Sequence, residues 1–400
     1  MEPYLQEFHP PARLLLGPGP SNVSPRVLQA MTAPVLGYLD PHFARVMDDI
    51  RAMLRLVFQT GNRLTLPVSG TGSAGMEAAL GNVLEPGDTL VVGVNGFFGE
   101  RLTQIGERCG ARVVQVQAPW GRPLDPEAVA AELRKNKRVK AVAVVHAETS
   151  TGVLNPVQEV ARVAREHDAL TIVDAVTSLG GIEVAVDQWG VDVSFSCSQK
   201  CLGCPPGLAP ITLGPRAEEV LGQRKTPPHS WYLDLNLTQR YWSQNLSYHH
   251  TPPTSMLYGL REGLRAILEE GLQARFRRHW RNGAALHAGL EALGLGLFAQ
   301  QGYRLPVLTS VRIPDGLNDD KVRSALLNEY NIEIGRGQGA MAGKIWRIGL
   351  MGENSRPSAV FSLLSALEQV LPREGFEVAK GESVAAAQRV LAEGDGSVAK

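Results

Sequence analysis

Leu170-Thr-Ile-Val-Asp-Ala-Val176 is the stretch of sequence that decides the fold. A short apolar run rich in β-branched residues predicts a strand buried on both faces, and such strands are typical of parallel sheets. A strand-like run at Val139 to His146 and a helical pattern at Pro156 to His167 precede it. A strand, a helix and a strand in this order indicate a crossover between parallel neighbours.

The same alternation extends in both directions from this stretch. Strands are predicted at 64–68, 88–92, 112–116, 191–196 and 208–213, and helices at 40–58, 76–83 and 126–135. Strands separated by helices predict a largely parallel sheet with helices on both faces. We therefore expect a large α/β domain over residues 21–255.

The pattern changes after Thr251-Pro-Pro253. Residues 256–299 form an almost continuous helical pattern, which is interrupted near Gly271 and Gly294. Strands predicted at 308–313, 332–334 and 345–349 then alternate with helices at 319–330 and 357–371. We expect a smaller α/β domain at 256–375, an N-terminal arm at 1–20, and a polar C-terminal tail at 376–400 whose last few residues are loose.

Composition argues against several classes of function. Of the 400 residues, 44% are hydrophobic and 20% are charged, and Lys+Arg and Asp+Glu both number 40. This neutral balance provides no electrostatic footprint for nucleic acid or a membrane surface, and no apolar run reaches the roughly 20 residues of a membrane span. Four cysteines are too few for a disulfide framework. Since the N-terminus also lacks targeting character, we expect a cytoplasmic protein.

Glycines follow the first predicted strand of the large domain, in Ser69-Gly-Thr-Gly-Ser73. Small residues between a strand and a helix expose backbone N–H groups at the positive end of the helix dipole, which suits a phosphate. Gly70, Gly72 and Gly75 also satisfy the dinucleotide pattern G-x-G-x-x-G. However, Asp88 begins a strand, where a ribose-binding acid would end one. We expect a phosphate cup, with a dinucleotide site or a purely structural turn as alternatives.

Two candidate catalytic residues lie at the ends of successive predicted strands. Asp174 ends a buried strand, where a carboxylate is costly without a partner, and Lys200 lies just past the next strand in Ser196-Cys-Ser-Gln-Lys200. Taken alone, Asp174 could equally be a helix cap or a metal ligand, and Lys200 an ordinary solvated lysine. Together with the glycine cup at the same sheet edge, they indicate pyridoxal phosphate (PLP). The acid would hold the pyridine nitrogen protonated, and the lysine would form a Schiff base.

Further segments carry a resemblance to a known family. They are Leu16-Gly-Pro-Gly-Pro-Ser-Asn22, Ser69-Gly-Thr-Gly72, Met76-Glu-Ala-Ala-Leu80, Leu84-Glu-Pro-Gly-Asp88, Glu148-Thr-Ser-Thr-Gly-Val153, Gly190-Val-Asp192, Ser198-Gln-Lys200, Pro205-Pro-Gly207, Tyr248-His-His-Thr251 and Trp346-Arg-Ile-Gly349. With them the sequence resembles the class V (fold-type I) aminotransferases, and within these the alanine–glyoxylate and serine–pyruvate (serine–glyoxylate) aminotransferases. The resemblance implies a seven-stranded, mostly parallel sheet and a PLP-dependent homodimer. Its expected reaction moves the amino group of alanine or serine to glyoxylate or pyruvate.

The resemblance also implies a role for each matching residue. Lys200 would be the Schiff-base lysine and Asp174 the pyridinium partner, and these are the two expected catalytic residues. The other expected cofactor contacts are Thr71, Gly72, Ser73 and Gln199 at the phosphate, Phe98, Thr149 and Val176 around the ring, and Tyr248 and Thr251 reaching the neighbouring subunit's cofactor. Arg347 would bind the substrate carboxylate through a bidentate fork, with Gly17 as a second substrate contact.

Three positions depart from the family's pattern. Phe98 stands where the animal enzymes commonly have a stacking tryptophan, so stacking is retained but the indole N–H is lost. Arg336 places an unfamiliar charge in the loop before Arg347, and Tyr38 lies where family members vary with substrate. These departures leave the choice of amine donor open, rather than the type of reaction.

Other functions are weighed against transamination. The same fold could serve a ureidoglycine–glyoxylate aminotransferase, a PLP lyase or a desulfurase, although a desulfurase needs a mobile cysteine and residues 335–343 contain none. A non-catalytic nucleotide-binding protein would lack a bound chromophore. Cys197, Cys201 and Cys204 have the spacing of a radical-SAM iron–sulfur motif, but Lys200 lies between the first two cysteines. His249 and His250 point to opposite sides of an extended segment, so we expect no metal site.

Overall fold

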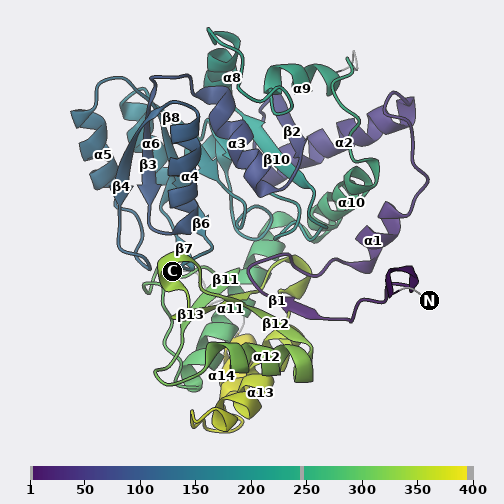
Figure 1. Cartoon of the computed structure of the whole chain (residues 1–400), viewed down its shortest axis with the longest axis vertical. Coiled ribbons are helices and arrows are strands. Elements are labelled where there is room, and N and C mark those ends of the chain that lie inside the picture. Colours follow the sequence, from purple (N-terminus) through teal and green to yellow (C-terminus); the bar gives the residue numbers. More distant parts are fainter. Residues whose placement is uncertain (1–2, 244–246, 394–400) are drawn as a thin grey trace.

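The computed structural model describes residues 3–243 and 247–393. Figure 1 shows two parts, an upper one built on a large sheet and a lower one built on a smaller sheet. The large sheet has seven strands in the order β2-β10-β9-β8-β5-β3-β4. Their bounds are β2 (Leu64–Ser69), β3 (Thr89–Val94), β4 (Arg112–Gln117), β5 (Val139–Val145), β8 (Leu170–Asp174), β9 (Val193–Phe195) and β10 (Leu208–Leu213).

Only β10 is antiparallel to its neighbours in this sheet, and the other described strands run in one direction. The predicted α/β fold with a mostly parallel seven-stranded sheet is therefore confirmed. The carboxyl ends of β2, β3, β8 and β9 consequently lie at the same edge of the sheet. A hairpin of β6 (Ala147–Glu148) and β7 (Val153–Leu154) follows β5.

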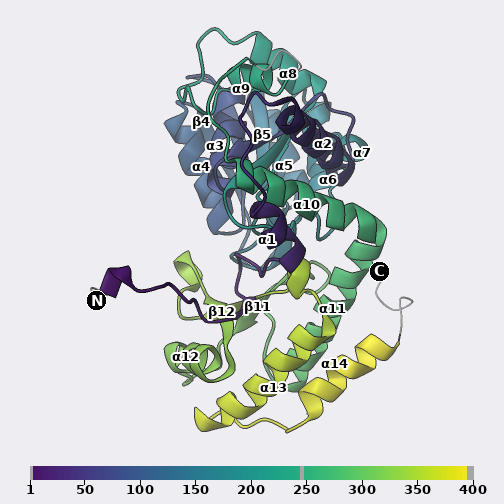
Figure 2. The same cartoon turned by 90° about the vertical axis from the view of Figure 1, so that its right-hand side faces the viewer.

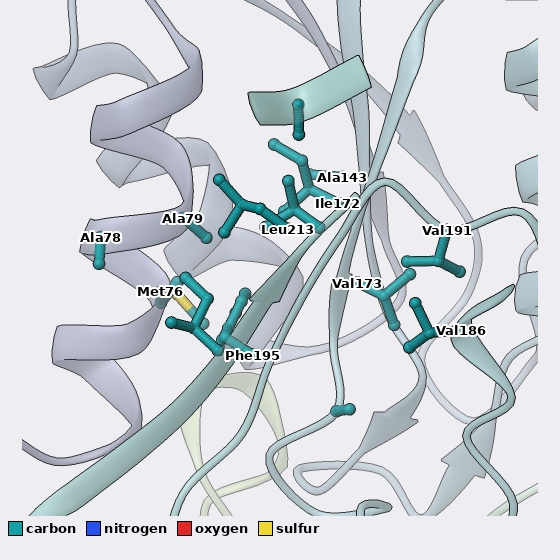
Figure 3. Close-up of a cluster of buried hydrophobic side chains, with 14 of the residues drawn as sticks. Met76, Ala78, Ala79, Ala143, Ile172, Val173, Val186, Val191, Phe195 and Leu213 are labelled. Atoms are coloured by element: carbon teal, nitrogen blue, oxygen red, sulfur yellow. The ribbon is translucent and has the colours of Figure 1, made fainter. Parts of the chain in front are cut away.

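Helices cover both faces of the large sheet. In this part of the chain they are α1 (Pro25–Met31), α2 (Pro41–Phe58), α3 (Gly72–Val83), α4 (Phe97–Arg108), α5 (Pro126–Lys135), α6 (Val157–Glu166), α7 (Val186–Trp189), α8 (Pro215–Gly222), α9 (Leu235–Tyr241) and α10 (Thr254–Glu270). Successive strand residues point to opposite faces. Figure 3 shows Phe195 facing Met76 of α3, while Val173 turns toward Val186 of α7. Apolar burial on both faces explains the continuous apolar strands in the sequence.

The smaller sheet has the strand order β1-β12-β13-β11. Its elements are β1 (Leu14–Leu16), β11 (Leu308–Arg312), β12 (Ile332–Arg336), β13 (Ile345–Gly349), α11 (Leu272–Ala292), α12 (Asp319–Tyr330), α13 (Pro357–Arg373) and α14 (Glu382–Ala392). Figure 2 shows α11 running from the end of α10 down into this lower part. The break between α10 and α11 falls at Gly271, with φ +82°, as the sequence predicted.

Two segments differ from the predicted arm and tail. Within the expected arm, β1 pairs in parallel with β12, so part of residues 1–20 belongs to the smaller sheet. Within the expected tail at 376–400, α14 packs its apolar face against α11 and α13. Burial of Leu16 and Ala387 in the lower core accounts for both. The looseness predicted for the last few residues concerns 394–400, which lie outside the described residues; the domain boundaries stay predictions.

Within residues 3–243 and 247–393, no helix combines the length and the apolar character needed to cross a membrane.

Candidate active site

Three loops meet at the carboxyl edge of the large sheet. They follow β2, β8 and β9, and they carry the glycine cup, Asp174 and Lys200. A Cβ added to Gly72 would lie 3.0 Å from Cγ2 of Val176 and 3.3 Å from Cβ of Cys197. Gly72 therefore contacts the other two loops, and a side chain here would press against both. The structure thus brings together the three segments that the sequence singled out.

The glycine cup is the N-terminus of α3. Thr71 is its N-cap, and no described side chain caps it. Gly70 has φ +149°, in the region that favours glycine, and it donates its N–H to the carbonyl of Gly207 at 2.9 Å. The first N–H groups of a helix have no partner inside the helix and carry the positive end of its dipole. An anion would satisfy both.

Asp174 ends β8 with a side chain that is 3% exposed. Its Oδ1 accepts a hydrogen bond from the N–H of Val176 at 2.8 Å, and no described cationic side chain forms an ion pair with it. Burial raises the pKa of this carboxyl to about 7, although the Val176 N–H and the nearby Lys200 favour the ionised form. A buried acid of this kind lacks a positive partner, which a protonated ring nitrogen would supply.

Lys200 lies partly buried in the turn after β9. Burial lowers the pKa of its amine, and the guanidinium of Arg347 lowers it further. The segment before α1 fixes this turn, because Ser21 donates its N–H to the carbonyl of Gln199 at 3.0 Å and its hydroxyl to the carbonyl of Lys200 at 3.0 Å. Gly19 has φ +112°, which favours glycine, and a Cβ there would lie 2.6 Å from Nζ of Lys200, so the backbone approaches the lysine closely.

Arg347 reaches the site from the smaller sheet. It lies in the middle of β13, between Ser310 of β11 and Gly335 of β12, and it is 4% exposed. Its Nε donates to the carbonyl of Arg336 at 2.8 Å. Within the described ranges it has no salt bridge to a carboxylate, and burial lowers its pKa to about 10. Gly17, the other expected substrate residue, packs beside Gly335 of β12.

The remaining expected contacts divide into two groups. Oε1 of Gln199 is buried without a hydrogen-bond partner among the described residues, and Thr149 shares a hydrogen bond of 2.8 Å with Thr177. Phe98 lies in the first turn of α4. In contrast, Tyr248 is 58% exposed, and its hydroxyl lies 3.5 Å from that of the exposed Thr251.

These observations test whether the residues fit PLP. Among the described residues, a buried amide oxygen without a hydrogen-bond partner, a helix N-terminus without a side-chain cap and a buried acid without an ion pair occur at one edge of the sheet. A glycine cradle that a Cβ would fill adjoins them. Phosphate and ring nitrogen would complement the cup and Asp174. The residues therefore fit the cofactor. The described residues contain no group of three His, Cys, Asp or Glu side chains suited to a metal ion.

Arg101 is a site residue that the sequence analysis missed. Its Nη1 donates to Oγ of Ser73 at 3.2 Å, and its guanidinium carbon lies 5.0 Å from the ring centroid of Phe98. The available signal was its spacing, since residues three apart on a helix share a face. Glu148 was also missed, although it begins a segment that carried the family resemblance. It is fully buried and influences the pKa of both Asp174 and Arg347.

Comparison with known proteins agrees with this geometry. The family described as "Aminotransferase class-V" matches residues 14–356. An (S)-ureidoglycine–glyoxylate transaminase of Bacillus subtilis is 44% identical, with 96% of each chain covered. An alanine–glyoxylate aminotransferase of Drosophila melanogaster is 39% identical, covering 90% of this chain and 93% of the relative.

Solved structures give the same result. The ureidoglycine–glyoxylate aminotransferase of Bacillus subtilis has a TM-score of 0.95 at 45% identity, covering 97% of this chain and 100% of the other. An alanine–glyoxylate aminotransferase from Nostoc has a TM-score of 0.90 at 50% identity, covering 92% and 97%. The expected family is confirmed: this chain belongs to the class V aminotransferases, a PLP-dependent family, and it is an aminotransferase.

Proposed function

We propose that the chain binds PLP through Lys200 and transfers an amino group to glyoxylate, with Arg347 holding the carboxylate of each substrate. The observation that carries the proposal is the state of Arg347. It is a buried guanidinium without a carboxylate partner among the described residues, and it is close enough to Lys200 to lower the pKa of the lysine amine.

A buried charge is costly unless it is paired. The Nε of Arg347 is already occupied by the carbonyl of Arg336, so the two terminal nitrogens remain for a ligand. A guanidinium matches a carboxylate through two parallel hydrogen bonds, and amino acids and 2-oxo acids both carry such a group beside the reacting carbon. Arg347 would therefore orient both partners of a transamination in the same way.

Lys200 and Asp174 divide the proton chemistry. When bound, PLP supplies an aldehyde that accepts the amino group and a ring that withdraws electrons. Burial lowers the pKa of Lys200, which increases the neutral fraction of its amine at neutral pH. A neutral amine can accept the proton from the substrate α-carbon and return it one position away. Asp174 would hold the proton on the ring nitrogen, because its carboxylate lacks another cationic partner.

The phosphate would lie at the N-terminus of α3. Backbone N–H groups of Gly72 and Ser73 would face it, with the side chains of Thr71, Ser73 and Gln199 around it. Arg101 adds a positive charge beside Ser73, and we propose it as a further phosphate-side residue. Phe98 would stack on the ring, with Thr149 and Val176 lining it.

The names of the relatives support glyoxylate as the amino-group acceptor more strongly than they support any one amine donor. The three enzymes compared above, from Bacillus subtilis, Drosophila melanogaster and Nostoc, are all named for glyoxylate, whether their donor is alanine or ureidoglycine. We propose alanine or serine as the donor, as the family resemblance implies. Ureidoglycine is the second candidate, because the Bacillus subtilis enzyme named for it is similar over 96% of both chains.

We further propose a homodimer in which Tyr248 and Thr251 reach the cofactor of the partner subunit. Support comes from their exposure in a single chain, and from the exposure of the nearby Trp231 and Tyr232 at 61% and 43%. Exposed aromatic side chains that gather on one surface are typical of protein interfaces. Dilution to the monomer should then release the cofactor, and a monomer that retained it would contradict the shared site.

The proposal is tested by half-reactions of the purified holoenzyme. Its visible absorbance should fall when alanine, serine or ureidoglycine is added, and glyoxylate should restore it. The donor that acts fastest identifies the substrate. Arg347→Lys should raise KM at least about tenfold for donor and acceptor, since a point charge replaces the fork. Arg312→Lys, a change on the neighbouring strand β11, is the matched control. An unchanged KM in Arg347→Lys would refute the carboxylate role.

A further inference from the structure

Glu148 is a buried carboxylate to which the chemistry above assigns no task. It is 0% exposed, at the end of β6, and burial raises the pKa of its side chain. Its negative charge favours the protonated form of Asp174 and the charged form of Arg347, so it lies near both. An acid in such a place needs partners, and these come from the start of a helix distant in sequence and from the nearby Ser150.

One of those partners belongs to the first turn of α4, and the others to Ser150. Oε2 of Glu148 accepts the N–H of Gly99 at 3.2 Å. Oε1 accepts the hydroxyl of Ser150 at 2.6 Å and the N–H of the same residue at 3.1 Å. The hydroxyl of Ser150 in turn accepts the N–H of Phe97 at 2.9 Å. Two N–H groups at the start of the helix are thus satisfied by Glu148 at the end of β6 and by Ser150 in the loop that follows.

The helix has no cap of its own among the described residues. Its N-cap is Gly96, which provides no side chain. A Cβ on Gly96 would lie 2.4 Å from Cγ of Glu148 and 2.5 Å from Oγ of Ser150, so the acid occupies the space that a capping side chain would take. A carboxylate at a helix N-terminus satisfies the free N–H groups and complements the dipole. Here the cap comes from residues 49 to 53 positions away in the sequence.

Helix α4 carries two side chains toward the proposed cofactor. Phe98 lies in the turn that Glu148 caps, and Arg101 follows one turn later, over the Phe98 ring and bonded to Ser73. Where α4 begins therefore decides where both side chains lie. A shift of the first turn would move the ring contact and the phosphate-side charge together.

We propose that Glu148 is a positioning residue that caps α4 from the end of β6 and thereby holds Phe98 and Arg101 against the cofactor. This inference rests on the proposed function, because it assigns the two side chains to PLP. It does not assign Glu148 any contact with substrate or cofactor. Its effect passes through the helix.

The test measures the dissociation constant of PLP on the refolded or dialysed cofactor-free protein, by fluorescence quenching. Glu148→Gln keeps the size of the side chain, but in either orientation of the amide one backbone N–H faces an NH₂ group. We expect PLP binding to weaken roughly tenfold, the effect of losing one helix cap near the ligand. The circular dichroism of the bound cofactor should change as well, because the stacked ring moves.

Asp125→Ala provides the control. Asp125 caps α5 by accepting the N–H of Glu127 at 2.9 Å, so this change removes a helix cap outside the site. It should lower the melting temperature but leave the PLP dissociation constant unchanged. Equal weakening of PLP binding in Asp125→Ala and Glu148→Gln would show that Glu148 contributes only general stability and would overturn the proposal.

A double-mutant cycle with Phe98→Ala separates positioning from other effects. If Glu148 acts through Phe98, Glu148→Gln should cost much less PLP affinity in the Phe98→Ala background than in the wild type. The same loss in both backgrounds, or no loss in the wild type, would refute the inference. Failure of the wild-type chain to bind PLP would instead refute the proposed function, so the two failures are distinguishable.

Discussion

Helices α3 and α4 both begin at the carboxyl edge of the large sheet, but their first turns differ. Glu148 and Ser150 satisfy the start of α4, and the helix in turn satisfies the buried carboxylate of Glu148. No described side chain caps the start of α3, and Asp174 nearby has no described ion-pair partner. One helix end and one acid satisfy each other, whereas the other helix end and the other acid do not.

This difference indicates the charge of the missing ligand. The α3 end would accept an anion and Asp174 a cation; the α3 end adjoins the loop that carries Lys200, and the charge of Lys200 acts on Asp174. A molecule with a phosphate at one end and a protonated ring nitrogen at the other meets both needs at once. The protein's own groups fill one site completely and leave the other incomplete, and the incomplete one is the proposed cofactor site.

The largest effect is expected when α3 receives a carboxylate cap, because its N-terminus then resembles that of α4. Thr71→Asp places an acid at the N-cap, which should stabilise the cofactor-free protein by about 1 kcal/mol. The same charge should repel the phosphate and weaken PLP binding on the order of a hundredfold. Melting temperature and PLP dissociation constant measure the two effects. Thr71→Asn, a neutral cap, should stabilise the cofactor-free protein similarly and lose less PLP affinity. A Thr71→Asp variant that bound PLP normally would contradict phosphate binding at the N-terminus of α3.

PLP affinity should depend on pH through Asp174, which has no described ion-pair partner. Without the cofactor its pKa is raised to about 7, so below that pH the carboxyl carries a proton that must leave before it can pair with a protonated ring nitrogen. PLP affinity should therefore fall below about pH 7, by at most about tenfold per pH unit. Asp174→Asn should lack this part of the pH dependence, although it binds more weakly. Equal pH profiles for the two proteins would exclude Asp174 as the pairing group.

Removing the charge of Arg101, which lies beside the N-terminus of α3, should have a smaller effect on PLP affinity. Arg101→Met retains an unbranched apolar chain over Phe98 but removes the guanidinium next to Ser73. We expect PLP affinity to fall roughly tenfold, as for one charge-assisted hydrogen bond. Arg108→Met, on the last turn of the same helix, controls for changes in helix charge. An unaltered dissociation constant in Arg101→Met would place the phosphate elsewhere.

The smallest effect on PLP binding should come from a side chain added at the capped N-terminus of α4. Gly96→Ala would press against Glu148, and we expect a loss of about 1–3 kcal/mol in the free energy of unfolding. PLP binding should weaken only a few-fold. Gly81→Ala in α3 is the control, since its Cβ would meet nothing within 4 Å and should be neutral or stabilising. A Gly96→Ala variant as stable as the wild type would contradict the close packing of the cap.

Local pattern predicted much of this molecule. The helices Pro126–Lys135 and Asp319–Tyr330 and the strand Leu208–Leu213 occur where periodicity placed them. Because the sheet is mostly parallel, strand-end residues such as Asp174 and Lys200 could be assigned to one edge. The pairing of β1 with β12 could not be predicted, since it joins residues more than 300 positions apart. The Glu148 cap escaped for the same reason: nothing local to Gly96 identifies a partner about 50 residues away.

The most direct test of the central claim is a crystal structure of the chain with PLP. The account predicts the phosphate at the N–H groups of Gly72 and Ser73, the ring nitrogen within hydrogen-bond distance of the Asp174 carboxylate, and a covalent bond to Nζ of Lys200. A cofactor bound in the reverse orientation, or at another part of the chain, would contradict it.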